Sequence, residues 1–291
     1  MPDVDGVLYY TDAMPPQDCV ADALRLEALG YDAIWLPDLF GRELFVTAGY
    51  LLAATTRLRV ATGIANVYAR DAMSAAQAAR TLSELYDGRF ILGLGVSHPQ
   101  AASARGHRWE APVQKLAAYL EGIASASVNA PEPPRVAPIF VAAHGPRLLA
   151  LAAERADGAN TYLMPPEHTR QAREILGPDK QLNVVLPCCL CADATAARGV
   201  ARKGLSMYMQ LPAYKRQWAR FGLDERDSND GGSDRLIDTL VAWGDESAVR
   251  AGITAHIEAG ANRIIVMPYH SLPKARERPW DLLAALAPGV R

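Results

Sequence analysis

The chain has 291 residues, of which 50% are hydrophobic, so it is long enough to bury the core of one large domain or of two modest domains. Its 30 Lys and Arg residues against 32 Asp and Glu residues give a formal net charge of −2, without a long run of like charges. This distribution argues against binding to nucleic acid or to an anionic membrane surface. We expect a small-molecule partner and a homodimer.

Two further features of the sequence indicate the cellular compartment in which the protein is expected. The first residues, MPDVDGVLYY, lack the basic and then apolar segments of a signal peptide, and the sequence contains no apolar run of about eighteen residues that could span a membrane. Three of the four cysteines, Cys188, Cys189 and Cys191, are crowded in a way that suits neither a disulfide framework nor a two-pair zinc site. We therefore expect a cytoplasmic protein with buried free thiols.

Short apolar runs alternate with helical patterns along nearly the whole chain, which predicts a parallel sheet covered by helices. In chain order, strands are predicted at Gly6–Tyr10, Ala33–Pro37, Leu58–Ile64, Phe90–Gly95, Ile139–Ala143, Gly158–Tyr162, Leu182–Leu190 and Arg263–Tyr269. Helices are predicted at Gln17–Leu29, Glu43–Thr55, Ala72–Leu85, Pro112–Ala126, Arg147–Ala156, Glu167–Leu176, Ala192–Ser206, Asp234–Trp243 and Glu246–Gly260. Eight such strands predict one domain over residues 1–291, an α/β fold of the (β/α)8 TIM-barrel type with loop insertions at the C-terminal face.

Glycines and polar stretches predict where the elements end. Gly30, Gly88, Gly158 and Gly260 each stand between a helical pattern and the next strand, so we expect each to end its helix in the left-handed conformation. The stretch Gln210–Gly232, which contains GLDERDSNDGGS, has no clear periodicity and is predicted to be a mobile loop.

Candidate site residues are those at the C-terminal ends of the strands, where TIM barrels place their active sites. Three of the six histidines follow predicted strands: His98, His144 and His270. Imidazoles from different strands can converge on zinc, so a metal-dependent hydrolase is an alternative, although no H-x-H or H-E-x-x-H spacing occurs. Each histidine can also be an ordinary polar residue of the rim.

A second group of strand ends predicts a phosphorylated aromatic ligand. Gly145 has no side-chain oxygen to cap the helix that follows it, and Pro146 suits the first helical position, so the free N–H groups face either water or a phosphate. Glycines in or at the end of strands, Gly63, Gly93 and Gly95, would let a flat ring approach the backbone, unless these are ordinary strand ends. The combination is typical of a flavin-like cofactor.

Several segments also match a known family: ALGYDAIWLPD, ATTRLRVATGIANVY, RTLSELYDGRFILGLGVSHP, AAHGPRLLALAAERADG and IEAGANRIIVMP. Together they resemble the bacterial luciferase-like superfamily, in particular its F420-dependent oxidoreductases, from about Val7 to Pro268. The resemblance implies a TIM barrel that binds the deazaflavin coenzyme F420 and transfers a hydride to or from a small organic substrate. FMN is the alternative cofactor, with monooxygenase or flavin reductase activity, and a non-catalytic flavin-binding role is a third hypothesis.

The resemblance also implies which residues contact the cofactor. A non-proline cis peptide behind the ring would lie within Gly63, Ile64, Ala65 and Asn66. The ring or ribityl chain would be lined by Gly95, Val96, Ser97 and His98, and the phosphate would be bound by Ala143, His144, Gly145 and Pro146. Tyr162, at the end of the sixth strand, is also assigned to the cofactor site.

Asp38 and His98 are the candidates for proton transfer, since a rim carboxylate or a histidine can act as acid or base. Sugar-phosphate dehydrogenases of the superfamily carry an Asp-His pair after strand two and a Glu after the strand-four glycines. Here Leu39 follows Asp38, and Val96 stands in place of the Glu, so sugar chemistry is not expected. Tyr208, Tyr214 and Trp218 either form walls of the substrate pocket or pack within helices.

Overall fold

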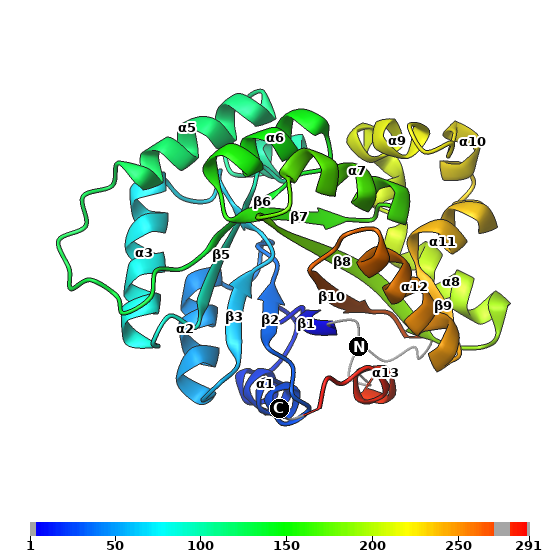
Figure 1. The fold of residues 1–291 in the computed structure, drawn as a ribbon, viewed down its shortest axis with the longest axis horizontal. Coiled ribbons are helices and arrows are strands. Elements are labelled where there is room, and N and C mark those ends of the chain that lie inside the picture. The colour runs from blue at the N-terminus through cyan, green and yellow to red at the C-terminus, as the bar shows by residue number, and fades with distance from the viewer. Residues whose placement is uncertain (1–3, 271–279, 290–291) are drawn as a thin grey trace.

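Eight parallel strands close into a barrel in the computed structural model, which describes residues 4–270 and 280–289 (Figure 1). The barrel strands are β1 (Val4–Leu8), β2 (Ala33–Leu36), β3 (Arg59–Thr62), β5 (Phe90–Gly95), β6 (Ile139–Ala142), β7 (Gly158–Tyr162), β8 (Gln181–Leu190) and β10 (Arg263–Pro268). The ring closes because β10 pairs in parallel with both β1 and β8. The predicted (β/α)8 barrel is confirmed.

Helices surround the barrel, and most of them overlap the helices that the sequence predicts (Figure 1). They are α1 (Pro16–Ala28), α2 (Leu44–Ala54), α3 (Ala72–Leu85), α5 (Pro112–Ala124), α6 (Pro146–Arg155), α7 (Pro166–Leu176), α8 (Ala194–Leu205), α11 (Asp234–Leu240) and α12 (Glu246–Glu258). The structure also contains the helices α4 (Pro99–Ala104), η1 (Tyr208–Gln210), α9 (Pro212–Ala219), α10 (Glu225–Ser228) and α13 (Trp280–Ala285). Proline begins many of these helices because its missing N–H costs no hydrogen bond at that position.

The alternation of side chains along each strand divides the core in two. Side chains such as Leu8, Trp35 and Ile265 point into the barrel and form one buried cluster. Their neighbours along the same strands, such as Val7 and Ile34, point outward and pack against the helices. Because every barrel strand is buried on both faces, these segments read in the sequence as continuous apolar runs.

Two short strands extend the sheet beyond the barrel. β4 (Ala65–Asn66) pairs with the end of β5, and β9 (Ala242–Gly244) pairs with the end of β8. The predicted helix Asp234–Trp243 is therefore wrong at its C-terminal end, because α11 ends at Leu240. The backbone of Ala242 and Trp243 pairs instead with β8, a partner more than fifty residues away that helical periodicity does not reveal.

Three of the four predicted glycine helix ends are confirmed, and one is wrong. Gly30, Gly88 and Gly260 have φ angles of 87°, 69° and 106°, the left-handed conformation that glycine adopts without strain. Gly158 is instead the first residue of β7. A Cβ atom there would lie 1.9 Å from the carbonyl oxygen of Gln181, so glycine is needed for the close approach of β7 to β8.

The stretch Gln210–Gly232 is not a structureless loop, and that prediction is wrong. It contains α9 and α10, and Trp218 of α9 is buried and donates a hydrogen bond from its indole N–H to the carbonyl oxygen of Leu163, 2.8 Å away. This tertiary contact orders a segment whose local sequence is polar. α10 is closed at its start by a capping box between Asp224 and Asp227.

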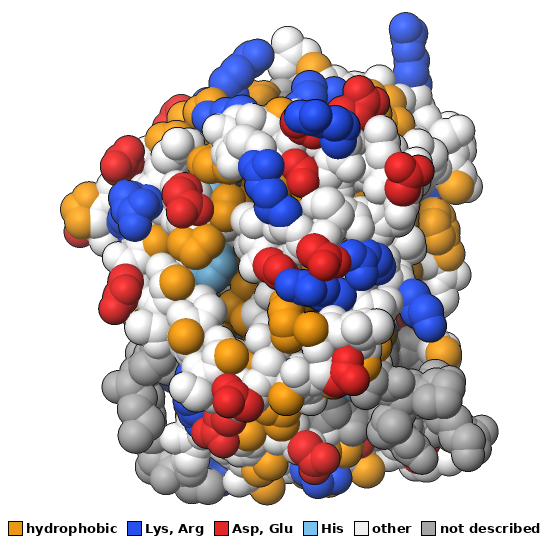
Figure 2. Space-filling model, turned by 90° about the vertical axis from the view of Figure 1, so that its right-hand side faces the viewer, with side chains coloured by type: hydrophobic (Ala, Val, Ile, Leu, Met, Phe, Trp, Pro, Cys, Tyr) orange, Lys and Arg blue, Asp and Glu red, His pale blue; other side chains and the backbone are white. Residues whose placement is uncertain are grey.

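The side of the molecule formed by α8 to α12 faces the viewer in Figure 2. Acidic and basic side chains are interspersed on it, and the surface is hollowed where hydrophobic side chains surround a histidine. Cys188 and Cys189 are buried free thiols, as expected, while Cys191 is half-buried. Within the described residues, we find no helix of the length and apolarity needed to cross a membrane.

Candidate active site

Tyrosines gather at the rim where the barrel strands end. Tyr162 is the last residue of β7 and Tyr269 follows β10, while Tyr208 and Tyr214 come from η1 and α9. The ring of Tyr208 lies 5.1 Å from that of Tyr162 and 5.2 Å from that of Tyr214, both edge to face. Burial raises the pKa of Tyr214 and Tyr269, so these phenols stay neutral. The rim thus offers aromatic walls with uncharged hydroxyl groups.

Two of the three predicted rim histidines join this tyrosine cluster. The ring of His98 lies 6.3 Å from that of Tyr214, and the ring of His144 lies 5.3 Å from it. Burial lowers the pKa of His98, and burial together with the neighbouring His168 and His98 lowers the pKa of His144 to about 3. Both imidazoles are therefore neutral near pH 7, and His98 can accept a proton.

The third rim histidine, His270, follows β10 and is half-buried. Across residues 4–270 and 280–289, no three His, Cys, Asp or Glu side chains come close enough to hold a metal ion. The alternative of a metal-dependent hydrolase therefore has no ligand set in this part of the chain.

The start of α6 has no side-chain cap, as the sequence predicts. Gly145 is the N-cap residue with extended backbone angles of −88° and 154°, and no side chain caps the first turn. The carbonyl oxygen of His144 accepts a hydrogen bond from Nε2 of His168 at 2.7 Å. Among the described residues, Nδ1 of His144 is buried without a hydrogen-bond partner. An uncapped helix start beside an unpaired buried nitrogen fits the phosphate of a cofactor.

The ends of β3 and β5 present backbone rather than side chains to the rim. The peptide bond between Gly63 and Ile64 is cis, in agreement with the resemblance. β3 pairs with β5 through Val60 and Ala61, and Asn66 of β4, the short strand that follows β3, pairs with Gly95 at the end of β5. A Cβ atom at Gly95 would lie 2.7 Å from Cγ1 of Ile64, so the side chain of Ile64 packs directly against the backbone of Gly95. Val96 and Ser97 continue this edge, half-buried.

Gly93 has a different role from the one predicted. A Cβ atom at this position would lie 2.1 Å from the carbonyl oxygen of Thr62. The hydroxyl of Thr62 also donates to the carbonyl of Gly93 and accepts from its N–H, at 2.7 and 2.8 Å. Gly93 is therefore required for contact between strands, and not for the approach of a ligand.

Asp38, at the end of β2, is surrounded by hydrogen-bond donors. Its side chain is 5% exposed and accepts from the backbone N–H of Asn66 at 3.0 Å. It also pairs with Arg70 at 2.8 Å and with Arg105 at 3.3 Å. Asp38 thus joins the end of β2 to β4 and to the residue that ends α4.

Sequence reasoning missed some of the residues at the rim. Arg70 and Arg105 stand in loops, where no periodic pattern marks them, and only the fold brings them to Asp38. Tyr269 could have been found, because it directly follows the last barrel strand. Of the three aromatic residues proposed as pocket walls, Tyr208 and Tyr214 lie at the rim, while Trp218 packs in the core.

These features define a (β/α)8-barrel protein whose rim has an open helix start, two backbone-lined strand ends and an aromatic wall. The sequence profile of the family described as luciferase-like monooxygenase matches residues 2–263, and the chain belongs to this family.

Curated relatives match part of this chain. A putative coenzyme F420-dependent oxidoreductase of Mycobacterium tuberculosis is 31% identical over 188 residues, which cover 63% of this chain and 52% of the relative. A 5,10-methylenetetrahydromethanopterin reductase of Methanolobus tindarius is 28% identical over 197 residues, which cover 59% of this chain and 60% of the relative. The matched region therefore spans 52% to 60% of the length of these relatives.

Solved structures match the whole fold. An F420-dependent secondary alcohol dehydrogenase in complex with an F420-acetone adduct superposes with a TM-score of 0.78 and 16% identity, over 100% of both chains. The coenzyme F420-dependent tetrahydromethanopterin reductase from Methanopyrus kandleri has a TM-score of 0.74 and 16% identity, over 99% of this chain and 98% of the other. At these identities the likeness shows a shared fold.

Proposed function

We propose that this protein is an F420-dependent oxidoreductase that transfers a hydride between the deazaflavin and a small, uncharged organic substrate. The observation that carries this proposal is the uncapped start of α6 at the same rim as the backbone-lined ends of β3 and β5. The names of the curated relatives support F420 as the cofactor. The neutral tyrosines at the rim favour a substrate without charge, because a buried charge would need a partner.

In this proposal, each part of the rim has a task. The first turn of α6, with Gly145 and His144, would hold the phosphate. The edges formed by residues 63–66 and 95–98 would support the ring, and Tyr162 would close its side. When bound, the deazaflavin supplies the carbon that gives or takes the hydride. A ring nitrogen of His98 would accept the proton from a substrate hydroxyl, and the tyrosine rings would exclude water from the rim.

We assign Asp38 a positioning role, because three donors already occupy its carboxylate. Asp38→Asn is expected to raise the KM for the cofactor roughly three- to tenfold with little change in kcat, since it loosens β4 and the end of α4. Steady-state kinetics across pH test this role. A large fall in kcat with loss of one limb of the pH profile would instead show that Asp38 transfers a proton.

The expected homodimer has a candidate surface on the outer side of α2. Val46 is 72% exposed, and Tyr50, one helical turn further on, is also exposed. Val46→Glu is therefore expected to convert a dimer to a monomer, as measured by light scattering during size-exclusion chromatography. Val136, 73% exposed and distant along the chain, provides the control Val136→Glu. A dimer that survives the change at Val46 would place the interface elsewhere.

A titration of the purified protein with oxidised F420, and in parallel with FMN, tests the proposed function through fluorescence quenching. Binding of F420 at micromolar concentrations with weak FMN binding is expected. The reverse preference would change the chemistry to flavin reduction or oxygenation, for which the same barrel is suited. Tight F420 binding without hydride transfer to any of a broad panel of acceptors would favour a non-catalytic role.

A further inference from the structure

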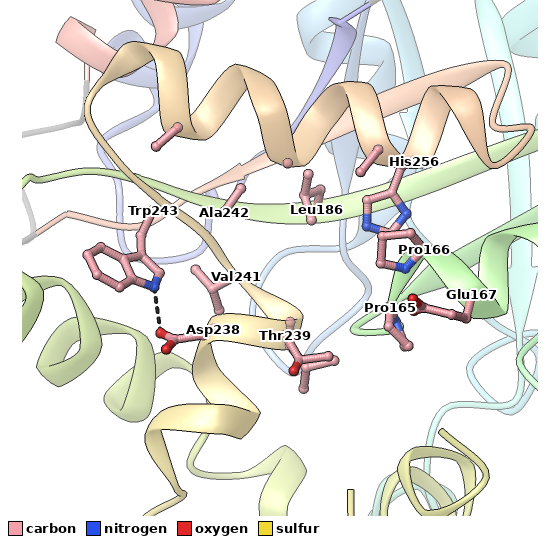
Figure 3. A pocket seen from close by; sticks show the side chains of 14 residues that line it. Pro165, Pro166, Glu167, Leu186, Asp238, Thr239, Val241, Ala242, Trp243 and His256 are labelled. Atoms are coloured by element: carbon pink, nitrogen blue, oxygen red, sulfur yellow. Dashed lines mark hydrogen bonds between the residues drawn. The ribbon is translucent and has the colours of Figure 1, made fainter. Parts of the chain in front are cut away.

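A cavity lies outside the barrel, over the outer face of β8 (Figure 3). It lies between the start of α7, the end of α11, β9 and α12, it is partly open to solvent, and its volume is about 330 Å³. The lining combines apolar residues, such as Leu186, Ala242 and Ala255, with the polar residues Glu167, Asp238, Thr239 and His256. A cavity of this size accepts a small organic molecule rather than a cofactor.

His256, on α12, directs its imidazole into this cavity (Figure 3). The side chain is 2% exposed, and Nδ1 lies 2.8 Å from the hydroxyl oxygen of Thr169. Thr169 is fully buried, and the described residues offer its hydroxyl no other acceptor. A buried hydroxyl that did not donate would be left unpaired, so we assign the hydroxyl as the donor to Nδ1, which places the ring proton on Nε2. Burial lowers the pKa of His256 to about 4, so the ring is neutral with Nε2–H as a donor.

Glu167, in the first turn of α7, adds a carboxylate to the same cavity (Figure 3). Within the described part of the chain this carboxylate has no ion-pair or hydrogen-bond partner. The other acidic residue of the lining, Asp238, is already paired with Arg198 and accepts a hydrogen bond from the indole of Trp243 at 2.8 Å. The cavity therefore presents one neutral donor, one free acceptor and an apolar wall.

We propose that this cavity binds a small, neutral hydroxyl compound such as a phenol. The ligand oxygen accepts a hydrogen bond from Nε2 of His256, and the ligand hydroxyl donates to the carboxylate of Glu167. The hydrocarbon part packs against Leu186 and Ala255. A carboxylate ligand would face the charge of Glu167. An ammonium ligand can pair with Glu167, but it offers no acceptor to the buried Nε2–H of His256, which a hydroxyl oxygen satisfies.

Saturation-transfer NMR and calorimetry on the full-length protein, with phenol, toluene, benzoate and benzylamine as probes, test this proposal. Phenol is expected to bind at least roughly tenfold more tightly than toluene and benzoate, because toluene makes neither hydrogen bond and benzoate faces the charge of Glu167, and it is expected to bind more tightly than benzylamine. Equal or tighter binding of benzoate or benzylamine would overturn the proposed class of ligand. Nitrogen-15 spectra of the histidines provide a second readout, because a proton on Nδ1 of His256 would contradict the proposed hydrogen bonds.

Substitutions in the lining test whether phenol binds in this cavity. Ala255→Leu fills the cavity and should abolish phenol binding, while Glu167→Ala should weaken it about tenfold. Glu174→Ala, on the exposed side of the same helix, is the control and should change nothing. Thermal unfolding verifies that each variant is folded. Phenol binding that survives Ala255→Leu would show that phenol binds elsewhere, and the proposal would then be wrong.

Discussion

Gly145→Asp is expected to weaken F420 binding about 100-fold or more, because it removes hydrogen bonds to the phosphate and adds a like charge beside it. The new carboxylate would cap the first turn of α6 and occupy the place proposed for the phosphate. The fold should tolerate the change, since the backbone angles of Gly145 are extended. A Cβ atom there would meet only Nε2 of Gln217, at an ordinary 3.5 Å.

Fluorescence titration measures this loss, and thermal unfolding shows whether the barrel is intact. Gly145→Ala is the matched control, because it adds the same Cβ atom without a cap or a charge. Its affinity should stay within about threefold of the unchanged protein, since the N–H groups remain available. An unchanged dissociation constant for Gly145→Asp would show that the phosphate does not bind at α6.

His98→Ala is expected to lower kcat about 10²- to 10⁴-fold while changing cofactor affinity only a few-fold, because a proton acceptor acts on the reacting substrate. The side chain stands between the end of β5 and the tyrosine cluster, with its ring 6.4 Å from that of Tyr208. Single-turnover reduction of F420 by an alcohol substrate measures the chemical step, and a parallel titration measures cofactor binding.

The pH dependence tests the same role. Burial lowers the pKa of His98 from its ordinary value of 6.5, so its neutral, proton-accepting form persists to more acidic pH than that of a free histidine. Activity should therefore fall only below about pH 6.5, and this acid limb should vanish in His98→Ala. His107→Ala, an exposed histidine of the same segment, is the control. Equal loss of turnover and of cofactor affinity would make His98 a binding or packing residue.

Most of the barrel follows from patterns that extend over about fifteen residues or fewer. The run of apolar residues in Phe90–Gly95 predicts a buried strand with the bounds that the structure has, and the periodicity of Ala72–Leu85 does the same for a helix. The uncapped glycine before Pro146 is also readable locally, because capping depends on neighbours in the chain. The strand and helix patterns recur along the chain and account for the barrel fold. The capping pattern accounts for the uncapped start of α6 at the rim.

Other features depend on residues that only the tertiary structure brings together. The sequence around Trp218 is polar and irregular, yet a core partner at Leu163 orders it as helix. In the sequence, Gly158 resembles the end of a helix. In the structure, a side chain at this position would collide with the backbone of Gln181 on the next strand, so glycine is needed there. In the sequence, Asp38 resembles a free carboxylate at the rim. In the structure, Arg70 and Arg105 come from two separate loops and form ion pairs with it. The sequence by itself determined the barrel and the strand ends that form its rim, because hydrophobic periodicity and helix capping act locally. Only the tertiary structure decided which side chains meet at that rim, because contacts between distant segments leave no local pattern.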